Sequence, residues 1–540
     1  MKSASDVTKS LRQRPPLRWW IAPLSIILVG TLTVTILRTV PDWENGTRTI
    51  ATVITSAVFV GIYSIWFIFF SQADRGLRWA VGVFELGFIA AVRLEGYSGD
   101  LEPRLAWRWL PKAHDSLSLP VASAPADARP VDLTRTTSHD YPQFLGPTRD
   151  GHVSGVELGR NWRPAPHELW RQPIGAGWSS FAIVGEFALT MEQRGQDELT
   201  VCYEARTGRV RWTFVNGLSF TSVMGGDGPR ATPTIDQGRV FVMGANGRLD
   251  CLEGASGKRI WTQDTVKDTK APLPTWGIAA SPLIVDHLVV VSPGGPDGHS
   301  LEAFDKQSGA LVWHAGSSPA SYASPMLATL AGKRQIVILN KDNCSAHDPA
   351  TGKLLWRFAW PGEQPKVPQP IVVGENRLLL SAGYGLGSKL IEIAPSEKSS
   401  AEASSEPKSA DEPADEMFEF AARELWASRA LKPKFDNPMV HDGSIYGIDD
   451  GMALTCLDLK TGKRKWRGGR YGHAQLLLVG ELLVVQTEVG DIALVDAKPD
   501  AYHEYTWFHA ISERAWNTPA LSGKLLLVRN HLEAAAFELP

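Results

Sequence analysis

The chain is poor in cysteine and carries almost no net charge. Four cysteines occur in 540 residues, none adjacent to another, and the formal net charge is -3. A chain this close to neutrality gives no reason to expect nucleic acid as a partner. The sequence contains no C-x-x-C-H haem site, no H-E-x-x-H, no G-x-S-x-G and no nucleotide-binding glycine-rich motif. Its histidines lack metal-ligand spacing, so we expect no metal site.

Glycine and proline, in contrast, are abundant. The chain holds 49 Gly and 36 Pro, which indicates many turns. A length of 540 residues exceeds what one compact core usually organises. We therefore expect several domains or one large repeat architecture.

Two long uncharged runs lie near the N-terminus. They are "WWIAPLSIILVGTLTVTIL" at residues 19–37 and "IATVITSAVFVGIYSIWFIFF" at residues 50–70. About 20 helical residues cross a hydrocarbon layer of about 30 Å, so both runs are predicted to span a membrane. A cleaved signal peptide is the alternative for the first run, although its apolar stretch is long for that purpose.

A third apolar segment leaves the topology open. Residues 79–92 are short and include Glu85, so the segment is either a third span or an interfacial helix. Five basic residues precede the first span and mark the cytoplasmic side: Lys2, Lys9, Arg12, Arg14 and Arg18. Two spans would leave the rest of the chain inside the cell, and three would place it outside. We expect residues 1–112 to be an inner-membrane anchor with two or three transmembrane helices, followed by a periplasmic body.

A short pattern recurs through the remainder of the chain. A glycine is followed four residues later by a tryptophan at five places, which end at Trp212, Trp261, Trp313, Trp356 and Trp466. The first four tryptophans are 49, 52 and 43 residues apart, and weaker copies occur at Trp170, Trp426 and Trp507. Repeats of this length that contain several short strands are typical of β-propellers. We predict an all-β, eight-bladed propeller over residues 141–540, with residues 113–140 as a linker.

The repeat also assigns structural roles to its residues. An acidic residue stands four positions before each repeat glycine, where its carboxylate can accept hydrogen bonds from the turn. Because it recurs in every copy, we interpret it as structural and not catalytic. Each repeat tryptophan is expected to begin the next blade and to pack against the neighbouring blade's turn. These predicted docking residues are Trp212, Trp261, Trp313, Trp356 and Trp466.

The stretch "AHDPATGKLLW" at residues 346–356 resembles the repeat of the pyrroloquinoline-quinone (PQQ) propeller family, Ala-x-Asp-x-x-Thr-Gly-x-x-x-Trp. The family includes quinoprotein dehydrogenases and a lipoprotein of the outer-membrane assembly machine, so the resemblance implies a fold without fixing an activity. The dehydrogenases hold PQQ with Ca²⁺, and many use a disulfide of adjacent cysteines, which this chain lacks. We expect a non-catalytic scaffold with no cofactor. The alternative is a PQQ-dependent membrane-bound dehydrogenase that uses PQQ with calcium.

Candidate binding residues stand three positions before the proline that opens each blade, or close to it. This position is rich in aromatic residues and arginine, which commonly anchor ligands. The candidates are Trp178, Arg230, Trp276, Tyr322, Phe435, His473 and Trp516. We expect them to bind a protein partner or a small ligand at the mouth of the channel, the alternative being that the rings only pack between blades. The acidic, low-complexity stretch at residues 395–418 is predicted to be a disordered insertion.

Overall fold

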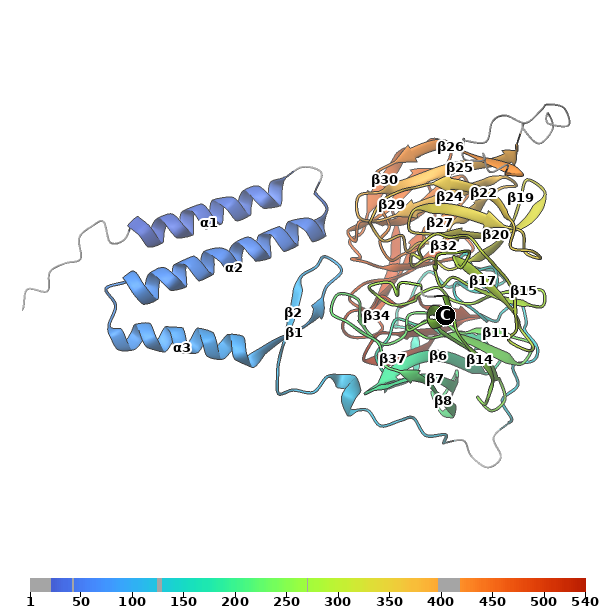
Figure 1. Ribbon diagram of the computed structural model, residues 1–540, viewed down its shortest axis with the longest axis horizontal. Coiled ribbons are helices and arrows are strands. Elements are labelled where there is room, and N and C mark those ends of the chain that lie inside the picture. The colour runs from blue at the N-terminus through green and yellow to red at the C-terminus, as the bar shows by residue number, and fades with distance from the viewer. Residues whose placement is uncertain (1–20, 41–42, 124–128, 270, 397–417) are drawn as a thin grey trace, which may run out of the picture. The chain divides into compact units, whose positions relative to one another are not determined.

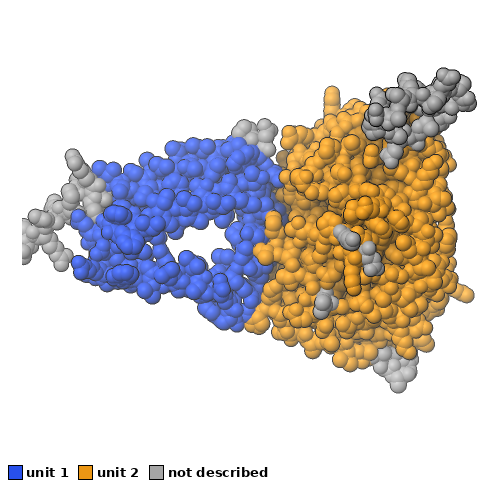
Figure 2. Space-filling model, in the orientation of Figure 1, with its two compact units in different colours: residues 1–110 blue, residues 111–540 orange. Residues whose placement is uncertain are grey.

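The structure of the protein is a computed structural model that describes residues 21–40, 43–123, 129–269, 271–396 and 418–540. The chain divides into two compact units, Met1–Leu110 and Pro111–Pro540 (Figure 2). The predicted insertion at residues 395–418 lies almost wholly outside the described residues.

The first unit contains three helices followed by a hairpin. The helices are α1 (Ile21–Thr39), α2 (Asn45–Phe70) and α3 (Arg75–Ala91). The hairpin pairs β1 (Val92–Tyr97) with β2 (Pro103–Trp107). Within the described part of this unit, α1 and α2 are long and apolar enough to cross a membrane, as the sequence predicts.

Helix α3 runs back along α2 (Figure 1). The Ser64 hydroxyl of α2 donates a 2.6 Å hydrogen bond to the Glu85 carboxylate of α3. Arg78, near the start of α3, donates to the carbonyl of Ile68, near the end of α2. A side chain added at Gly82 would meet Ile68 at 3.3 Å, so α3 packs closely on α2. The third apolar segment is therefore a helix paired with the second.

The described residues of the second unit form eight sheets arranged as a propeller, which confirms the predicted fold class (Figure 1). The first three blades are β5 (Ala182–Val184), β6 (Phe187–Arg194), β7 (Asp197–Glu204) and β8 (Val210–Leu218); β11 (Thr234–Asp236), β12 (Arg239–Met243), β13 (Arg248–Glu253) and β14 (Arg259–Asp264); and β15 (Leu283–Val285), β16 (Leu288–Val291), β17 (Leu301–Asp305) and β18 (Leu311–Ala315). The next three are β19 (Met326–Leu330), β20 (Lys333–Leu339), β21 (Asn343–His347) and β22 (Leu354–Ala359); β23 (Ile371–Val373), β24 (Arg377–Ala382), β25 (Gly387–Pro395) and β26 (Phe420–Ser428); and β27 (Met439–His441), β28 (Ser444–Asp449), β29 (Ala453–Asp458) and β30 (Arg464–Gly468).

The last two blades recruit strands from the start of the unit. The seventh has β31 (Gln475–Val479), β32 (Leu482–Gln486), β33 (Asp491–Asp496) and β34 (Glu504–His509), and β3 (His152–Val153) pairs in parallel with β31. The eighth has β35 (Ala520–Ser522), β36 (Leu525–Arg529) and β37 (Glu533–Glu538), completed by β4 (His167–Pro173). Short additions are η3 (Ala113–Ser116), β9 (Thr221–Ser222), β10 (Gly226–Asp227) and α4 (Thr265–Thr269). The pairing of β37 with β4 closes the ring.

The repeat tryptophans lie in the fourth strand of their own blade, so the prediction that each begins the next blade was wrong by one strand. Trp212, for example, lies in β8 of the first blade, opposite Cys202 of β7. From this outer strand the indole reaches the turn between the third and fourth strands of the next blade. There the Trp212 indole N–H donates to the Gly254 carbonyl at 2.9 Å.

The same contact recurs around the ring, as predicted. Trp261, Trp313 and Trp466 donate to carbonyls of the following blade, as do Trp170 and Trp426. The acidic residue of each turn caps it: the Asp348 carboxylate accepts from the backbone N–H groups of Ala350 and Thr351.

Two tryptophans depart from this pattern. Trp356 packs in a cluster shared with the next blade, but its indole N–H donates to Gln335 of its own blade and not to a carbonyl of the next. In the next blade, residues 396–419 stand between β25 and β26 in place of a short turn. Trp507 is 59% exposed, because β37 and β4 of the following blade are not joined by a turn.

Part of the predicted linker, residues 113–140, packs against the propeller. Val131 and Leu133 are buried in the cluster that also holds Leu189 and Trp212 of the first blade. The Ser123 N–H donates to the Val210 carbonyl of β8. Part of residues 113–140 is therefore bound to the propeller, because its apolar side chains cover the outside of two blades.

Candidate functional site

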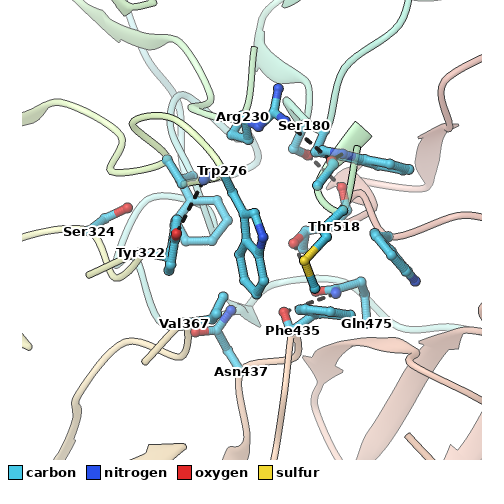
Figure 3. A pocket seen from close by; sticks show the side chains of 16 residues that line it. Ser180, Arg230, Trp276, Tyr322, Ser324, Val367, Phe435, Asn437, Gln475 and Thr518 are labelled. Atoms are coloured by element: carbon cyan, nitrogen blue, oxygen red, sulfur yellow. Dashed lines mark hydrogen bonds between the residues drawn. The ribbon is translucent and has the colours of Figure 1, made fainter. Parts of the chain in front are cut away.

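A cavity of about 140 Å³ lies where the innermost strands of the blades begin. Each blade-opening proline directly precedes its innermost strand, as Pro325 precedes β19 and Pro438 precedes β27, so the loops before these prolines converge on the channel. Six of the seven predicted site residues line the cavity (Figure 3): Trp178, Arg230, Trp276, Tyr322, Phe435 and Trp516. The structure thus brings together residues that are up to 338 positions apart in the sequence.

The rings of the cavity contact one another. Trp276 stacks on Tyr322 with centroids 4.8 Å apart, and Phe435 lies 4.7 Å from Trp516. Trp178 lies 5.0 Å from Trp516. The indole N–H groups of Trp178 and Trp516 are occupied by the Gly225 carbonyl and the Glu488 carboxylate. These bonds fix the ring orientations and leave apolar faces toward the cavity.

Arg230 is the one charged side chain among the lining residues, all of which are described. Its Nη2 donates to the carbonyls of Gly225 and Gly226, and its guanidinium lies 4.6 Å from the Phe220 ring. Its Nε and Nη1 are buried without a hydrogen-bond partner among the described residues. Burial lowers the pKa of Arg230 to about 10, so it remains a cation at neutral pH. Unpaired buried N–H donors of this kind favour an acceptor supplied from outside.

Polar residues directly before the innermost strands, or at their first residue, bond to one another across blades. The Ser180 N–H donates to Thr232, the Thr232 N–H to Ser281, and the Ser281 N–H to Ser324, at 2.9 to 3.0 Å. On the far side of the ring, the Thr518 hydroxyl donates to the Gln475 side chain. This chain of bonds fixes the floor of the cavity, so these residues have a structural role of their own.

His473 does not line the cavity, in contrast to the prediction. It is 2% exposed, and its ring lies behind Phe435 at a centroid distance of 5.2 Å. Among the lining residues that sequence reasoning missed, Ser324, Asn437 and Thr518 stand directly before a blade-opening proline, so a periodic signal was present. Phe144 and Met224 come from segments outside the repeat and have no such signal.

The lining residues do not suit a calcium-bound quinone. Ca²⁺ takes six to eight oxygen ligands, usually including carboxylates, yet the lining contains no Asp or Glu and its single charge is a cation. Across the described residues, no group of three or more His, Cys, Asp and Glu is placed to hold a metal ion. The four cysteines are buried and lie in four different blades, so no pair faces the cavity. No group placed here for proton transfer or nucleophilic attack is evident from the lining.

The fold and the repeated turns define a class of protein, the PQQ-like repeat propellers. The profile of the family described as "Outer membrane protein assembly factor BamB" matches residues 195–468, just over half of the chain. The chain therefore belongs to the PQQ-like repeat β-propeller family. No curated protein sequence matches the chain.

Solved structures with the same fold differ in their named activities. The quinohemoprotein alcohol dehydrogenase of Comamonas testosteroni is 12% identical with a TM-score of 0.52, and the match covers 74% of this chain and 80% of that one. A europium-containing methanol dehydrogenase is 12% identical with a TM-score of 0.53, over 74% and 91% of the two chains. BamB of Moraxella catarrhalis is 13% identical with a TM-score of 0.47, over 70% and 98%. At these identities the likeness is one of fold.

Proposed function

We propose that the protein is a membrane-tethered, non-catalytic scaffold that binds an apolar group of a protein partner at the channel mouth. The observation that carries this proposal is the cavity itself: six aromatic side chains and one arginine with two unpaired N–H groups, without an acidic or nucleophilic set. Aromatic residues and arginine are the side chains that most often anchor protein interfaces.

The size of the cavity favours an anchoring side chain over a large ligand. Its volume is about 140 Å³, close to that of engineered apolar cavities that take up a single benzene ring. Met224 of the lining is 43% exposed and its neighbour Val223 54%; Val489, which follows the Glu488 that bonds to Trp516, is 63% exposed. A central pocket surrounded by exposed apolar side chains is typical of a protein interface.

We propose further that α3 is a third span and that the propeller lies in the periplasm. The Ser64–Glu85 bond supports this, because it joins the middle of α3 to α2 and gives the carboxylate a partner within the bundle. An interfacial helix would diverge from α2 instead of running back along it. With the basic N-terminal segment in the cytoplasm, three spans carry the chain across the inner membrane.

Site-specific photocrosslinking in living cells tests the proposed partner site. A photoreactive amino acid at Val489, which follows the Glu488 that bonds to Trp516 of the lining, is expected to give a crosslinked adduct. The adduct should be lost when Arg230, Tyr322 and Trp516 are all replaced by Ala. The same probe at Val312, which is 47% exposed on the outer strand β18, is the control and should give no such adduct. An adduct at Val489 that survives the triple replacement would contradict the proposal.

The dehydrogenase alternative has a direct test. Calorimetric titration of the purified protein with PQQ and Ca²⁺ is expected to show no saturable heat. Saturable one-to-one binding at micromolar affinity or tighter would instead favour the PQQ-dependent enzyme, and artificial electron acceptors would then be used to screen alcohols and sugars.

A further inference from the structure

The β1–β2 hairpin of the first unit has one apolar face and one polar face. Its register places Val92 opposite Trp107 and Leu94 opposite Leu105, while Arg93 stands opposite Ala106. Because alternate residues of a strand point to opposite faces, the first two pairs share one face. Leu94 is 40% exposed, Leu105 58% and Trp107 43%, so the described residues leave much of this apolar face uncovered.

The apolar face continues the surface of α3. Strand β1 begins at Val92, directly after α3 ends at Ala91. Phe88 of α3 contacts the edge of Trp107 at a centroid distance of 6.2 Å, and Trp107 stacks on Trp109 at 5.1 Å. Trp109 is 66% exposed. Because the apolar surface continues from α3 onto the hairpin, we expect both to lie in the same apolar environment.

The charged residues of the hairpin are of both signs, because Glu95, Asp100 and Glu102 offset its three arginines and Arg93 pairs with Glu95. Arg93, Arg104 and Arg108 all lie within residues 92–108, and the Arg108 side chain donates to the Val92 carbonyl. Tryptophan is a residue that collects where acyl chains meet lipid headgroups, and Trp107 and Trp109 lie at this end of the hairpin. An isolated two-stranded hairpin is marginally stable in water, so an apolar support under this one would also explain its order.

We propose that the β1–β2 hairpin is a membrane-interface element that inserts its apolar face at the acyl boundary and keeps its charged residues toward the headgroups and water. The occupant of this face is the bilayer leaflet into which α3 emerges. The inference rests on α3 lying in the membrane and does not depend on what the channel mouth binds.

Depth-dependent fluorescence quenching tests the proposal on the full-length chain. The four native cysteines are all 0% exposed, so a single added surface cysteine can be labelled selectively. Leu105→Cys on the apolar face and Glu95→Cys as the exposed polar control would each carry an environment-sensitive fluorophore. Both proteins would be reconstituted into vesicles of phosphatidylcholine and phosphatidylglycerol, with nitroxide quenchers on the lipids or iodide in the buffer.

The proposal predicts that the Leu105→Cys probe emits at shorter wavelength than the Glu95→Cys probe, and that lipid nitroxides quench it while iodide does not. Quenching by iodide would mean that the face is in water and would overturn the proposal. Blue-shifted emission that neither quencher reduces would mean that protein covers the face, either a second copy or another part of this chain, and would overturn it as well.

Discussion

Each repeat glycine meets two separate requirements. Gly257 has a φ of +72°, and a Cβ added to it would lie 2.5 Å from the Trp212 ring of the preceding blade. The left-handed conformation costs other residues about 1–2 kcal/mol, and the clash adds a cost typical of overpacking, about 1–3 kcal/mol. We predict that Gly257→Ala lowers the free energy of unfolding by about 2–5 kcal/mol, measured by denaturant unfolding.

Gly480 offers a matched control. It has a φ of +60°, but a Cβ added there meets nothing within 4 Å. Gly480→Ala should therefore cost only the conformational part, about 1–2 kcal/mol. Equal losses in the two variants would show that the tryptophan contact adds nothing to the docking of blades.

A buried carboxyl predicts how stability changes with pH. Burial raises the pKa of Asp436 to about 8, well above its ordinary value of 3.8, and the nearby Asp449 adds to the shift. Between about pH 4 and pH 8 the folded protein holds this proton while the unfolded chain releases it. The free energy of unfolding should therefore fall as pH rises through this window, by up to about 1.4 kcal/mol per pH unit.

Asp436→Asn should remove this contribution. The Asn side-chain oxygen can still accept the Ile448 N–H that Asp436 accepts at 2.8 Å, and it carries no proton to lose. Unfolding midpoints at pH 5 and pH 8 should therefore differ less in the variant than in the unmodified protein. Some dependence should persist, because burial also raises the pKa of Glu198 to about 7. An unchanged difference would contradict the assignment.

Residues that recur in every blade were predicted more accurately from the sequence than residues that occur in one blade. The glycine-to-tryptophan spacing revealed the docking contacts because every blade needs the same turn. The departure of Trp356 depends on the next blade, where the short turn is missing. The burial of His473 depends on the packing of Phe435 over it, which a position in the repeat does not specify. Met224 reaches the cavity from the connection between β9 and β10, a pairing that the described residues of the other blades lack.

At the scale of elements, β4 is the strand that completes the ring. It pairs with β37, as in Ala535 opposite Arg171, and its Trp170 donates to the Ala205 carbonyl beside the first repeat turn. We predict that a chain of residues 111–540 folds with one cooperative thermal transition, whereas a chain of residues 174–540 does not. Without β4 the eighth blade keeps an unpaired strand and its core cluster loses Trp162. Circular dichroism on both chains measures the difference, and a cooperative transition in the shorter chain would contradict it.

The blade boundaries show why the order of strands within a blade was harder to predict than the number of blades. Counting from each tryptophan gives the correct total, because any fixed point of a repeat counts units equally well. It does not reveal which strand is innermost. The structure settles this through the prolines that directly precede β11, β15, β19, β23, β27 and β35. Proline lacks an N–H, so it suits the first residue of a strand and not its interior.

At the scale of the whole molecule, the number of spans decides the compartment. Lys524 is exposed in the turn between β35 and β36, and Gln72 is exposed between α2 and α3. Under three spans, a membrane-impermeant maleimide applied to intact cells, with the outer membrane made permeable, should label Lys524→Cys and leave Gln72→Cys unlabelled. The buried native cysteines give little background. Under two spans neither position would react, and the periplasmic assignment would be wrong.

Because β37 pairs with β4, the ring can close only late in translation. The strand that completes the eighth blade leaves the ribosome early, and its partner, at residues 533–538, leaves after the strands of the other seven blades. Until β37 has been made, the ring is open. The blades at its two ends then lack their neighbours, while the N-terminal apolar helices have already been synthesised. Nascent propellers crowded on the same membrane could pair through these end blades, so a holding chaperone would be most useful between the emergence of β4 and that of β37.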